Sequence, residues 1–382
     1  MFFRITLAWC VLPLAACSAT ADSVEPTEPT ALAFTNVPWT WTADAAAGCA
    51  DGSTTGFGSN LSPDGSSNVL VWFEGGALCY SPGQCVTHPV GPHAYSASTF
   101  SSEATSFGAK GIFDRSDATN PFADWSFVWV PYCTQDLHAG AHTMNYNGTT
   151  FHHVGDATAR RLMTDAAGVF YAPAGSTVVL AGSSAGAYGA LFHVGDAAAL
   201  WPMAALHVLL DSGPELAQPY LPAAQQQAAN ASWATVYPAS CGGGGACAAV
   251  SGADTGWHKI VGAQAAAFAS SRFGFLSNDQ DRVVSTGWGT QPSGDPRLSC
   301  NVGQPCEFGL VPASGRTLPG IQDFRVNVVD PAHGHVFYVS GTGHQLAAGR
   351  AGVSLATSQG GTTLASWLGT LLSGTGFVDV YP

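Results

Sequence analysis

The sequence predicts an α/β protein whose single domain contains a doubly wound, mostly parallel sheet. Apolar runs without polar alternation indicate strands buried on both faces, and they occupy residues 68–73, 127–130, 177–181, 206–210, 273–276 and 336–339. Stretches suited to helices lie among them, at residues 155–167, 187–200, 258–271 and 362–372. Strands that alternate with helices are typical of α/β domains. Residues 241–247 and 285–319 are expected to form loops or lids.

The composition supports one large folded domain and argues against a polyanionic partner. The chain has 382 residues, of which 46% are hydrophobic and 10% are charged, so it has ample material for a core. Its formal net charge is -13, and lysine occurs only at Lys110 and Lys259. Because no basic cluster is present to neutralise phosphates, we do not expect nucleic acid to be a partner.

The first 35 residues indicate export. Residues 1–16 carry Arg4 and then an apolar run that is too short to span a bilayer, which is typical of a signal peptide. The run ends in Leu14-Ala15-Ala16-Cys17, which is similar to the lipobox of bacterial lipoproteins, whose cysteine is lipidated. A plain signal peptide with an incidental cysteine is the alternative. Residues 17–35 then form a flexible tether rich in Ser, Thr, Pro and Glu, and the folded domain occupies 36–382.

These features predict a protein of the bacterial envelope, in the periplasm or at the cell surface, or a secreted one. We expect a monomer that touches the membrane only through its N-terminal lipid.

Cysteine usage agrees with an oxidising compartment. Without Cys10 and Cys17, eight of the 10 cysteines remain. Equal spacing favours the pairs Cys79/Cys85, Cys241/Cys247 and Cys300/Cys306, which leaves Cys49 and Cys133 for a long-range bridge. Eight cysteines permit 105 connectivities, so this pairing is a preference among many.

One serine has the surroundings of a catalytic nucleophile. Gly182-Ser183-Ser184-Ala185-Gly186 lies between an apolar strand and a helix rich in Ala and Leu. This is the nucleophile elbow of α/β-hydrolases, where flanking glycines allow a tight turn that exposes the serine hydroxyl. An ordinary Gly/Ser loop is the alternative for the pentapeptide, and the strand and helix around it favour the elbow.

The serine needs a base and an acid, which in this fold follow in the order Ser, Asp/Glu, His. His344 follows the strand at 336–339 in a glycine-rich loop and is the candidate base. The acid is Asp281, Asp279 or Asp211, each of which follows a strand, and the usual position favours the pair Asp279/Asp281. An aspartate that is not catalytic is expected to cap a turn.

Other histidines are not expected to bind a metal. His333 and His335 precede the last strand and would emerge at the wrong edge of the sheet. They, or His152 and His153, lack a third ligand at a recognisable spacing, so we expect neither a metal nor an organic cofactor.

A glycine-rich segment after the first buried strand supplies a candidate oxyanion hole. Phe73-Glu74-Gly75-Gly76-Ala77 lies upstream of the serine, as the oxyanion loop of esterases does. Backbone N–H groups of Gly75, Gly76, Ala77 and, after the nucleophile, Ala185 are the candidate donors. A Gly-Gly β-turn is the alternative for this segment alone.

In combination these motifs resemble the pectin acetylesterase/Notum family of serine ester hydrolases, from about Val37 to about Leu346. The family's E-G-G-x-x-C loop matches residues 74–79, its P-Y-C motif matches residues 131–133 with Asp136 and Gly140 downstream, and its elbow matches residues 182–189. Its acid motif aligns with residues 273–281 without gaps, which implies that the acid is Asp281. Ala77-Leu78 replaces the Gly-Trp or Trp-Tyr of the family, so the acyl or sugar pocket is expected to differ in shape. The histidine region also lacks a cysteine found in plant members.

The resemblance implies a serine esterase that removes small acyl groups, chiefly acetyl, from a polysaccharide or a small ester. Because pectin is anionic and the chain carries a charge of -13, a neutral acetylated glycan is also considered. The alternatives are a lipase-like or polyester-cleaving carboxylesterase, and a non-catalytic surface adhesin that retains the fold.

Overall fold

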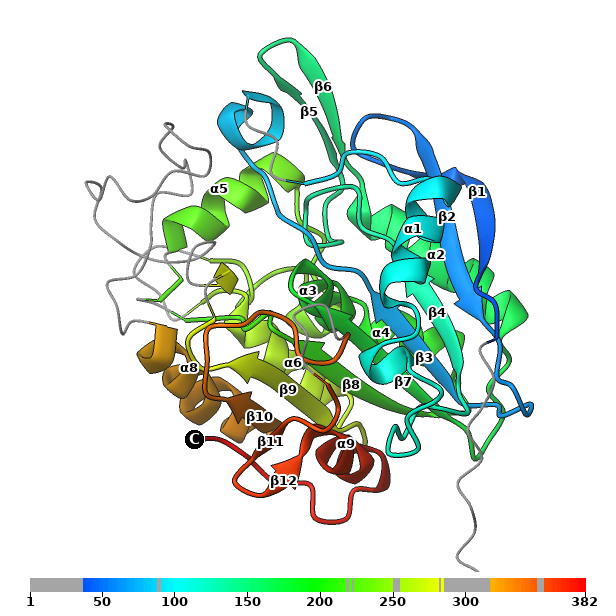
Figure 1. Cartoon of the computed structure of the whole chain (residues 1–382). Coiled ribbons are helices and arrows are strands. Elements are labelled where there is room, and N and C mark those ends of the chain that lie inside the picture. Colours follow the sequence, from blue (N-terminus) through cyan, green and yellow to red (C-terminus); the bar gives the residue numbers. More distant parts are fainter. Residues whose placement is uncertain are drawn as a thin grey trace, which may run out of the picture. The chain divides into compact units, whose positions relative to one another are not determined.

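The computed structural model describes residues 37–87, 91–217, 220–221, 223–249, 255–281, 283–284, 317–348 and 354–382. Their main element is an 8-stranded sheet in the order β1-β2-β4-β3-β7-β8-β9-β10 (Figure 1). The first two pairings, β1 with β2 and β2 with β4, are antiparallel, and all the others are parallel. The sheet is therefore mostly parallel, as predicted.

The strands that were predicted from apolar runs are present. They are β3 (Val69–Phe73), β4 (Ser126–Val130), β7 (Thr177–Ser183), β8 (Ala205–Asp211), β9 (Phe273–Asn278) and β10 (His335–Val339). Six more strands were not predicted: β1 (Thr40–Gly48) and β2 (Thr54–Asn60) at the edge of the sheet, the hairpin of β5 (His142–Tyr146) and β6 (Thr149–His153), and the short pair of β11 (Ser358–Gln359) and β12 (Thr362–Thr363). Residues 362–363 had been assigned to the last helix.

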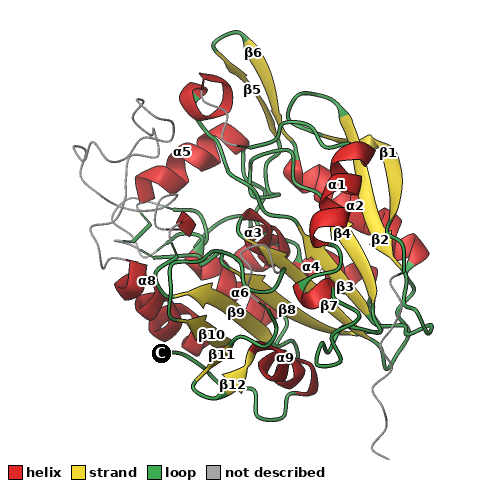
Figure 2. Cartoon of the chain, viewed as in Figure 1, coloured by secondary structure: helices red, strands yellow, loops and turns green. Residues whose placement is uncertain are grey.

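Helices cover both faces of the sheet (Figure 2). One core cluster joins alternate strand residues to α2 (Gly155–Val169), α3 (Ala185–Phe192), α4 (Val194–Leu200), α5 (Ala223–Trp233), α6 (His258–Ala267) and α8 (Thr317–Phe324). The opposite cluster joins the other strand residues to α1 (Ala97–Phe107) and α9 (Leu364–Ser373). The described residues also form short helical turns: η1 (Gly83–Thr87), η2 (Gly111–Phe113), η3 (Ala239–Cys241), η4 (Arg325–Val329) and η5 (Asp330–Ala332). Burial on both faces explains why the central strands are continuously apolar.

Two predicted helices differ from the structure. The helix expected at 187–200 is two helices, α3 and α4, which meet at His193. The His193 ring bonds to the carbonyl of His138 through Nε2 and to Asp196 through Nδ1, both at 2.8 Å, and these bonds fix the residue at the junction. The helix expected at 258–271 ends at Ala267. Residues 317–319, predicted as loop, begin α8.

The strand order places a switch point between β3 and β7. β3 pairs with β4 on one side and with β7 on the other, so successive crossovers diverge there. In open α/β sheets, ligands bind beyond the carboxyl ends of the strands at such a point. The loops after β3 and β7 carry the candidate oxyanion segment and the candidate nucleophile, so the fold brings these two segments together. None of the described helices is both long and apolar enough to cross a membrane.

Candidate active site

Ser184 lies in a strained turn between β7 and α3. Its backbone has φ 56° and ψ -123°, which is rare for a residue other than glycine. A Cβ on Gly182 would overlap the carbonyl oxygen of Gly186, and a Cβ on Gly186 would overlap that of Phe73. Both glycines of the pentapeptide are therefore required by close backbone approach. The turn has the geometry of a nucleophile elbow, and Ser184 is only partly buried.

The segment after β3 packs directly against this turn. A Cβ on Gly75 would overlap the carbonyl oxygen of Ser183 and lie 2.9 Å from the Cβ of Ser184. Ala185 is the first residue of α3, so its N–H has no acceptor within the helix. The two candidate donor segments therefore flank Ser184, which is the arrangement that an oxyanion hole requires.

A buried polar network, which the sequence did not reveal, supports this segment. The imidazole of His138 donates from Nε2 to the carbonyl of Glu74 at 3.0 Å. Burial lowers the pKa of His138 to about 3, so the ring is neutral at physiological pH. The Glu74 carboxylate accepts hydrogen bonds from Trp129 Nε1 at 3.3 Å and from Tyr132 N at 3.4 Å. His138 therefore holds the backbone that leads into Gly75.

The aspartate of the family-like Pro-Tyr-Cys region is structural. Asp136 is fully buried and accepts hydrogen bonds from Thr134 Oγ1 at 2.7 Å and from Gly155 N at 2.8 Å. A Cβ on Gly140 or Gly155 would overlap its carboxylate. Burial raises the pKa of Asp136 to about 6. The side chain therefore ties the start of α2 to the loop after β4.

Asp281 and His344 are joined by a hydrogen bond. His344 Nδ1 lies 2.7 Å from Asp281 Oδ2, and the carboxylate is fully buried. Its other oxygen accepts hydrogen bonds from the N–H groups of Val283 at 2.8 Å and Val284 at 3.0 Å. A carboxylate bonded to Nδ1 fixes the tautomer in which Nε2 can accept a proton.

The other two candidate aspartates bond elsewhere. Asp279 accepts a hydrogen bond from Gly341 N at 2.9 Å. Asp211 is fully buried and accepts from the N–H groups of Leu346 and Ala347, each at 2.8 Å, and from Ser212 Oγ at 2.9 Å. Burial raises the pKa of this carboxyl group. Both aspartates stabilise the loop that carries the histidine.

Asp211 also links that loop to the nucleophile. Its backbone carbonyl accepts a hydrogen bond from Ser184 N at 2.7 Å, while its carboxylate accepts from the N–H groups of Leu346 and Ala347. In addition, Ser212 Oγ accepts from Gln345 N at 2.9 Å. Asp211 is therefore bonded both to the nucleophile turn and to the histidine loop, and Ser212 adds a second bond to that loop.

Three disulfides stabilise the described part of the chain: Cys49–Cys133, Cys79–Cys85 and Cys241–Cys247. Two of them join the equally spaced pairs, and Cys49–Cys133 is the long-range bridge expected from the two cysteines that remained. Cys300 and Cys306 lie outside the described residues, as do the predicted signal peptide, Cys17 and the tether. His153 lies near the sulfur atoms of Cys79 and Cys85, but both sulfurs are committed to a disulfide. His335 bonds to Asp379 at 3.1 Å at the far end of β10, as expected from its position in the sequence.

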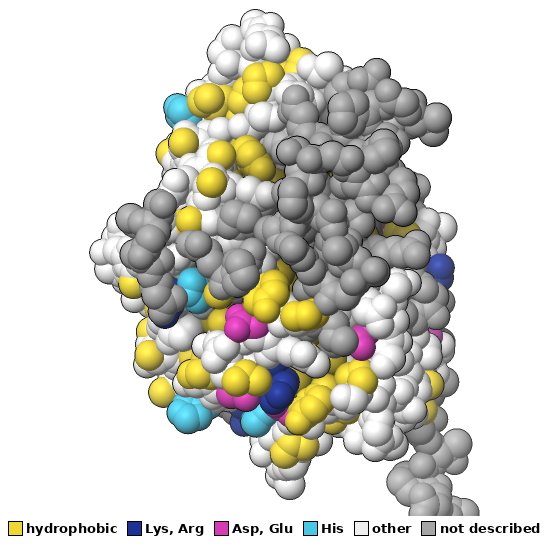
Figure 3. All heavy atoms as spheres, turned by 90° about the vertical axis from the view of Figure 1, so that its left-hand side faces the viewer, with side chains coloured by type: hydrophobic (Ala, Val, Ile, Leu, Met, Phe, Trp, Pro, Cys, Tyr) yellow, Lys and Arg dark blue, Asp and Glu magenta, His cyan; other side chains and the backbone are white. Residues whose placement is uncertain are grey.

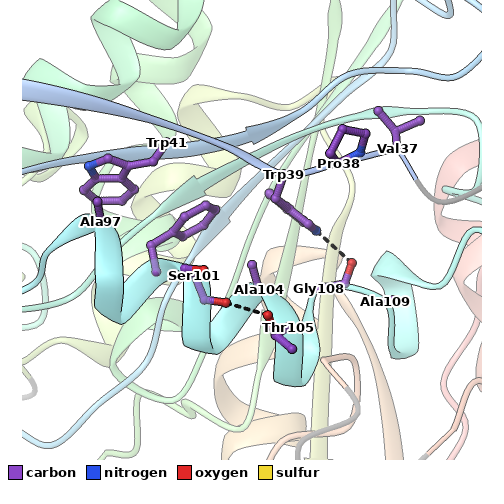
Figure 4. A pocket seen from close by; sticks show the side chains of 11 residues that line it. Val37, Pro38, Trp39, Trp41, Ala97, Ser101, Ala104, Thr105, Gly108 and Ala109 are labelled. Carbon is purple, nitrogen blue, oxygen red and sulfur yellow. Dashed lines mark hydrogen bonds between the residues drawn. The ribbon is translucent and has the colours of Figure 1, made fainter.

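A surface pocket of about 430 Å³ lies apart from these residues. It is formed where the start of β1 meets α1, and its lining includes Trp39, Trp41, Phe100, Ser101 and Thr105 (Figure 4). Trp39 Nε1 donates to the carbonyl of Gly108 at 2.8 Å. None of the predicted site residues lines this pocket.

The face of the molecule that carries α5 and α8 has few basic side chains. In Figure 3, hydrophobic side chains are spread over the visible described residues, and Lys and Arg are sparse. This agrees with the formal charge of -13.

Three comparisons relate the chain to known proteins. The family model "Pectinacetylesterase" matches residues 31–237. The palmitoleoyl-protein carboxylesterase NOTUM of Schmidtea mediterranea is 30% identical over 148 residues, and palmitoleoyl-protein carboxylesterase notum2 of Xenopus laevis is 31% identical over 157 residues. These matches cover 38% and 40% of this chain but only 27% and 30% of the two relatives.

The fold is shared with a solved structure. The Wnt deacylase Notum from Drosophila superposes with a TM-score of 0.63 over 91% of this chain and 95% of that chain, at 17% sequence identity. A second crystal form gives a TM-score of 0.62 at 18% identity. At this identity the similarity establishes the fold.

Proposed function

The chain belongs to the pectinacetylesterase family, and from this premise we propose that it is an exported serine ester hydrolase that removes small acyl groups, chiefly acetyl, from a polysaccharide. The observation that best supports the proposal is the 2.7 Å hydrogen bond between His344 Nδ1 and the buried Asp281 carboxylate. The loop that carries this histidine is tied through Asp211 to the turn that carries Ser184.

In the acylation step, Ser184 Oγ attacks the ester carbonyl while His344 Nε2 takes its proton. Asp281 orients the ring and stabilises the imidazolium that forms. The oxyanion develops beside the segments that contain Gly75 and Ala185, with the N–H groups of Gly76 and Ala77 as further candidate donors. His344 then gives the proton to the leaving alcohol.

In the deacylation step, a water molecule replaces the alcohol. His344 removes a proton from the water as it attacks the acyl-serine, and Ser184 recovers its proton when the acid leaves. His344 carries out every proton transfer in both steps, so the proposed mechanism uses neither a metal nor an organic cofactor.

The net charge of -13 favours a neutral acetylated glycan over pectin itself, because like charges repel along a polyanion. The names of the two relatives point to a second candidate, an esterase for fatty acyl groups. Esters of increasing acyl length distinguish the two, since the first candidate predicts the highest kcat/KM for acetyl and the second for long chains.

The test is turnover of 4-nitrophenyl acetate by the wild type and by Ser184→Ala, with Ser183→Ala as a matched control. We expect Ser184→Ala to lose activity by ~10⁴-fold or more. Ser183→Ala should retain substantial activity with a comparable thermal midpoint. Turnover that depends on Ser183 instead would show that the wrong serine has been assigned. A wild type that hydrolyses no ester of the series would favour the adhesin alternative.

We further propose that the mature protein is a monomer held to the bacterial envelope by a lipid on Cys17. Mass spectrometry of the N-terminal peptide is expected to find diacylglycerol on that cysteine, and Cys17→Ala should release the protein into the soluble fraction. An unmodified N-terminus upstream or downstream of Cys17 would support a plain signal peptide instead.

A further inference from the structure

The segment that follows β8 contacts the nucleophile turn. A Cβ on Gly213 would lie 2.5 Å from the carbonyl oxygen of Ser184 and 2.6 Å from the Cβ of Ala187. The carbonyl of Pro214 accepts a hydrogen bond from the Tyr188 hydroxyl at 2.7 Å, one turn into α3. The next residue, Glu215, is therefore held beside the elbow by contacts on both of the residues that precede it.

Glu215 is fully buried, and neither of its carboxyl oxygens has a partner at hydrogen-bond geometry among the described residues, although its own backbone N–H lies near enough to lower its pKa against the larger effect of burial. Burial raises its pKa to about 8, so the group is a neutral carboxylic acid at pH 7. The network that supports the oxyanion segment does not include it. A buried polar group without a partner lowers the stability of the fold, so the presence of Glu215 calls for an explanation.

A second buried hydroxyl shares this region. Tyr338 in β10 is 4% exposed, and its hydroxyl has no hydrogen-bond partner in the described part of the chain. Burial, Asp379 and, to a smaller extent, Glu215 raise the pKa of Tyr338, which means that the Glu215 carboxyl is within electrostatic range of the phenol. Both groups can donate and accept a hydrogen bond in their neutral forms.

Tyr338 is part of the hydrophobic core, and charged groups act on it as well: Asp330, like Asp379, raises its pKa, and Arg325 lowers it. Tyr338 belongs to the same buried cluster as Leu216 and Leu221 from the segment after β8, Val284 from the segment after Asp281, and Phe324 from α8. Because Leu216 of this cluster follows Glu215 directly, the buried acid borders both the hydrophobic core and the nucleophile turn.

We propose that Glu215, together with Tyr338, forms a specificity subsite that hydrogen-bonds a hydroxyl group of the ester substrate close to the scissile bond. A hydroxyl both donates and accepts, so it can satisfy the neutral acid and the phenol at once. A hydrocarbon in its place leaves both groups buried and unpaired, which is the strongest basis for rejecting an analogue. The inference rests on the proposed function, because it assigns the substrate class of that same site.

The experiment compares kcat/KM within matched pairs of esters. One pair carries the hydroxyl in the acyl part, 4-nitrophenyl 3-hydroxybutyrate against 4-nitrophenyl butyrate. The other carries it in the alcohol part, glycerol 1-acetate against propyl acetate. The ratio within a pair cancels losses of folded enzyme and of general catalytic power, so a purely structural role does not change it.

The wild type is expected to favour the hydroxylated member of at least one pair by about tenfold or more, because a hydrogen bond to a buried polar group has that magnitude. Glu215→Leu should bring this ratio close to one. Glu215→Gln, which keeps a donor and an acceptor, should retain most of the preference, and Tyr338→Phe should reduce it. The control Asp323→Asn changes a partly exposed carboxylate on α8 that accepts from Asn327, and it should leave both ratios unchanged.

Ratios that remain within twofold of the wild type in Glu215→Leu for both pairs would overturn the inference. A wild type without any preference in either pair would do the same. Ser184→Ala, run with every ester, separates this failure from the failure of the proposed function. Turnover that persists in Ser184→Ala refutes the serine mechanism itself, whereas turnover that requires Ser184 but ignores Glu215 refutes only the subsite.

Discussion

Replacing Asp281 by Asn should abolish turnover while the fold remains intact. The carboxylate accepts the His344 Nδ1 proton at 2.7 Å, and an amide nitrogen facing Nδ1 would favour the opposite tautomer. In that tautomer Nε2 carries a proton and cannot take one from Ser184. Loss of the acid in a serine hydrolase costs ~10⁴ in kcat, which corresponds to about 5.4 kcal/mol of transition-state stabilisation.

Two matched variants make this prediction specific. Asp279→Asn changes an acceptor for Gly341 N on the same loop, and it should keep most of the activity. Asp211→Asn places an amide against the N–H groups of Leu346 and Ala347, so we expect it to lower the free energy of unfolding by about 1–3 kcal/mol. The folded molecules of the Asp211→Asn variant should still hydrolyse the ester, because they retain the Asp281–His344 pair.

The assay is kcat for 4-nitrophenyl acetate at pH 8, measured beside the thermal midpoint of each variant. A loss of activity in Asp281→Asn at an unchanged midpoint would agree with the assignment. An Asp281→Asn enzyme within tenfold of the wild type, together with an inactive Asp211→Asn enzyme of normal stability, would refute it. The catalytic acid would then follow β8, and the alignment of residues 273–281 with the family motif would be wrong.

Three further predictions concern the oxyanion segment, the disulfides and the buried acid. Gly75→Ala should reduce kcat by ~10²-fold or more through a displaced oxyanion donor, whereas Gly168→Ala, where a Cβ meets nothing within 4 Å, should not; equal kcat values would exclude the segment from catalysis. Removing the Cys49–Cys133 bridge, with a sequence separation of 84, should cost ~4–5 kcal/mol against ~2 kcal/mol for a short-loop bridge, as measured by denaturant unfolding. Folding raises the pKa of Glu215 from 4.5 to about 8, so between these pH values the folded state keeps a proton that the unfolded chain loses. The free energy of unfolding should therefore fall as the pH rises from 4.5 to about 8. The difference in unfolding free energy between the wild type and Glu215→Gln should therefore decline by about 1 kcal/mol per pH unit, and a flat difference would contradict the raised pKa.

Sequence patterns predicted the central sheet because burial on both faces leaves a strong signature. The strands β3, β4, β7, β8, β9 and β10 are short and mostly apolar, and all six were predicted. The edge of the sheet had no such signature, since β1 reads TWTADAAAG and is largely exposed. Helix α1, with the sequence ASTFSSEATSF, was also missed, because its stability comes from a capping box at Ser96 and from the burial of Phe100 rather than from helix propensity.

The candidate site was predictable to the extent that its residues follow strands. Ser184, Asp281 and His344 each come after a parallel strand, and such loops meet at one edge of the sheet. Among the three aspartates, strand position favoured the pair Asp279/Asp281 and the family resemblance implied Asp281, which is the carboxylate that lies 2.7 Å from His344 Nδ1. His138 and Glu215 gave no signal, because a single polar residue in a loop does not reveal that it is buried.

Backbone strain marks the same edge of the sheet. Residues other than glycine with positive φ are uncommon, and at functional sites such strain is maintained by the surrounding structure. Six of the nine in the described chain lie just beyond the carboxyl ends of β4, β7, β8 or β10: Gln135, Leu137, His138, Ser184, Ser212 and Gln345. Glu215 lies three residues after Ser212, so the unpartnered acid and the strained backbone occupy one region. Strain and unpaired polarity both reduce stability, and their coincidence beside Ser184 is expected where a fold gives up stability for binding and catalysis.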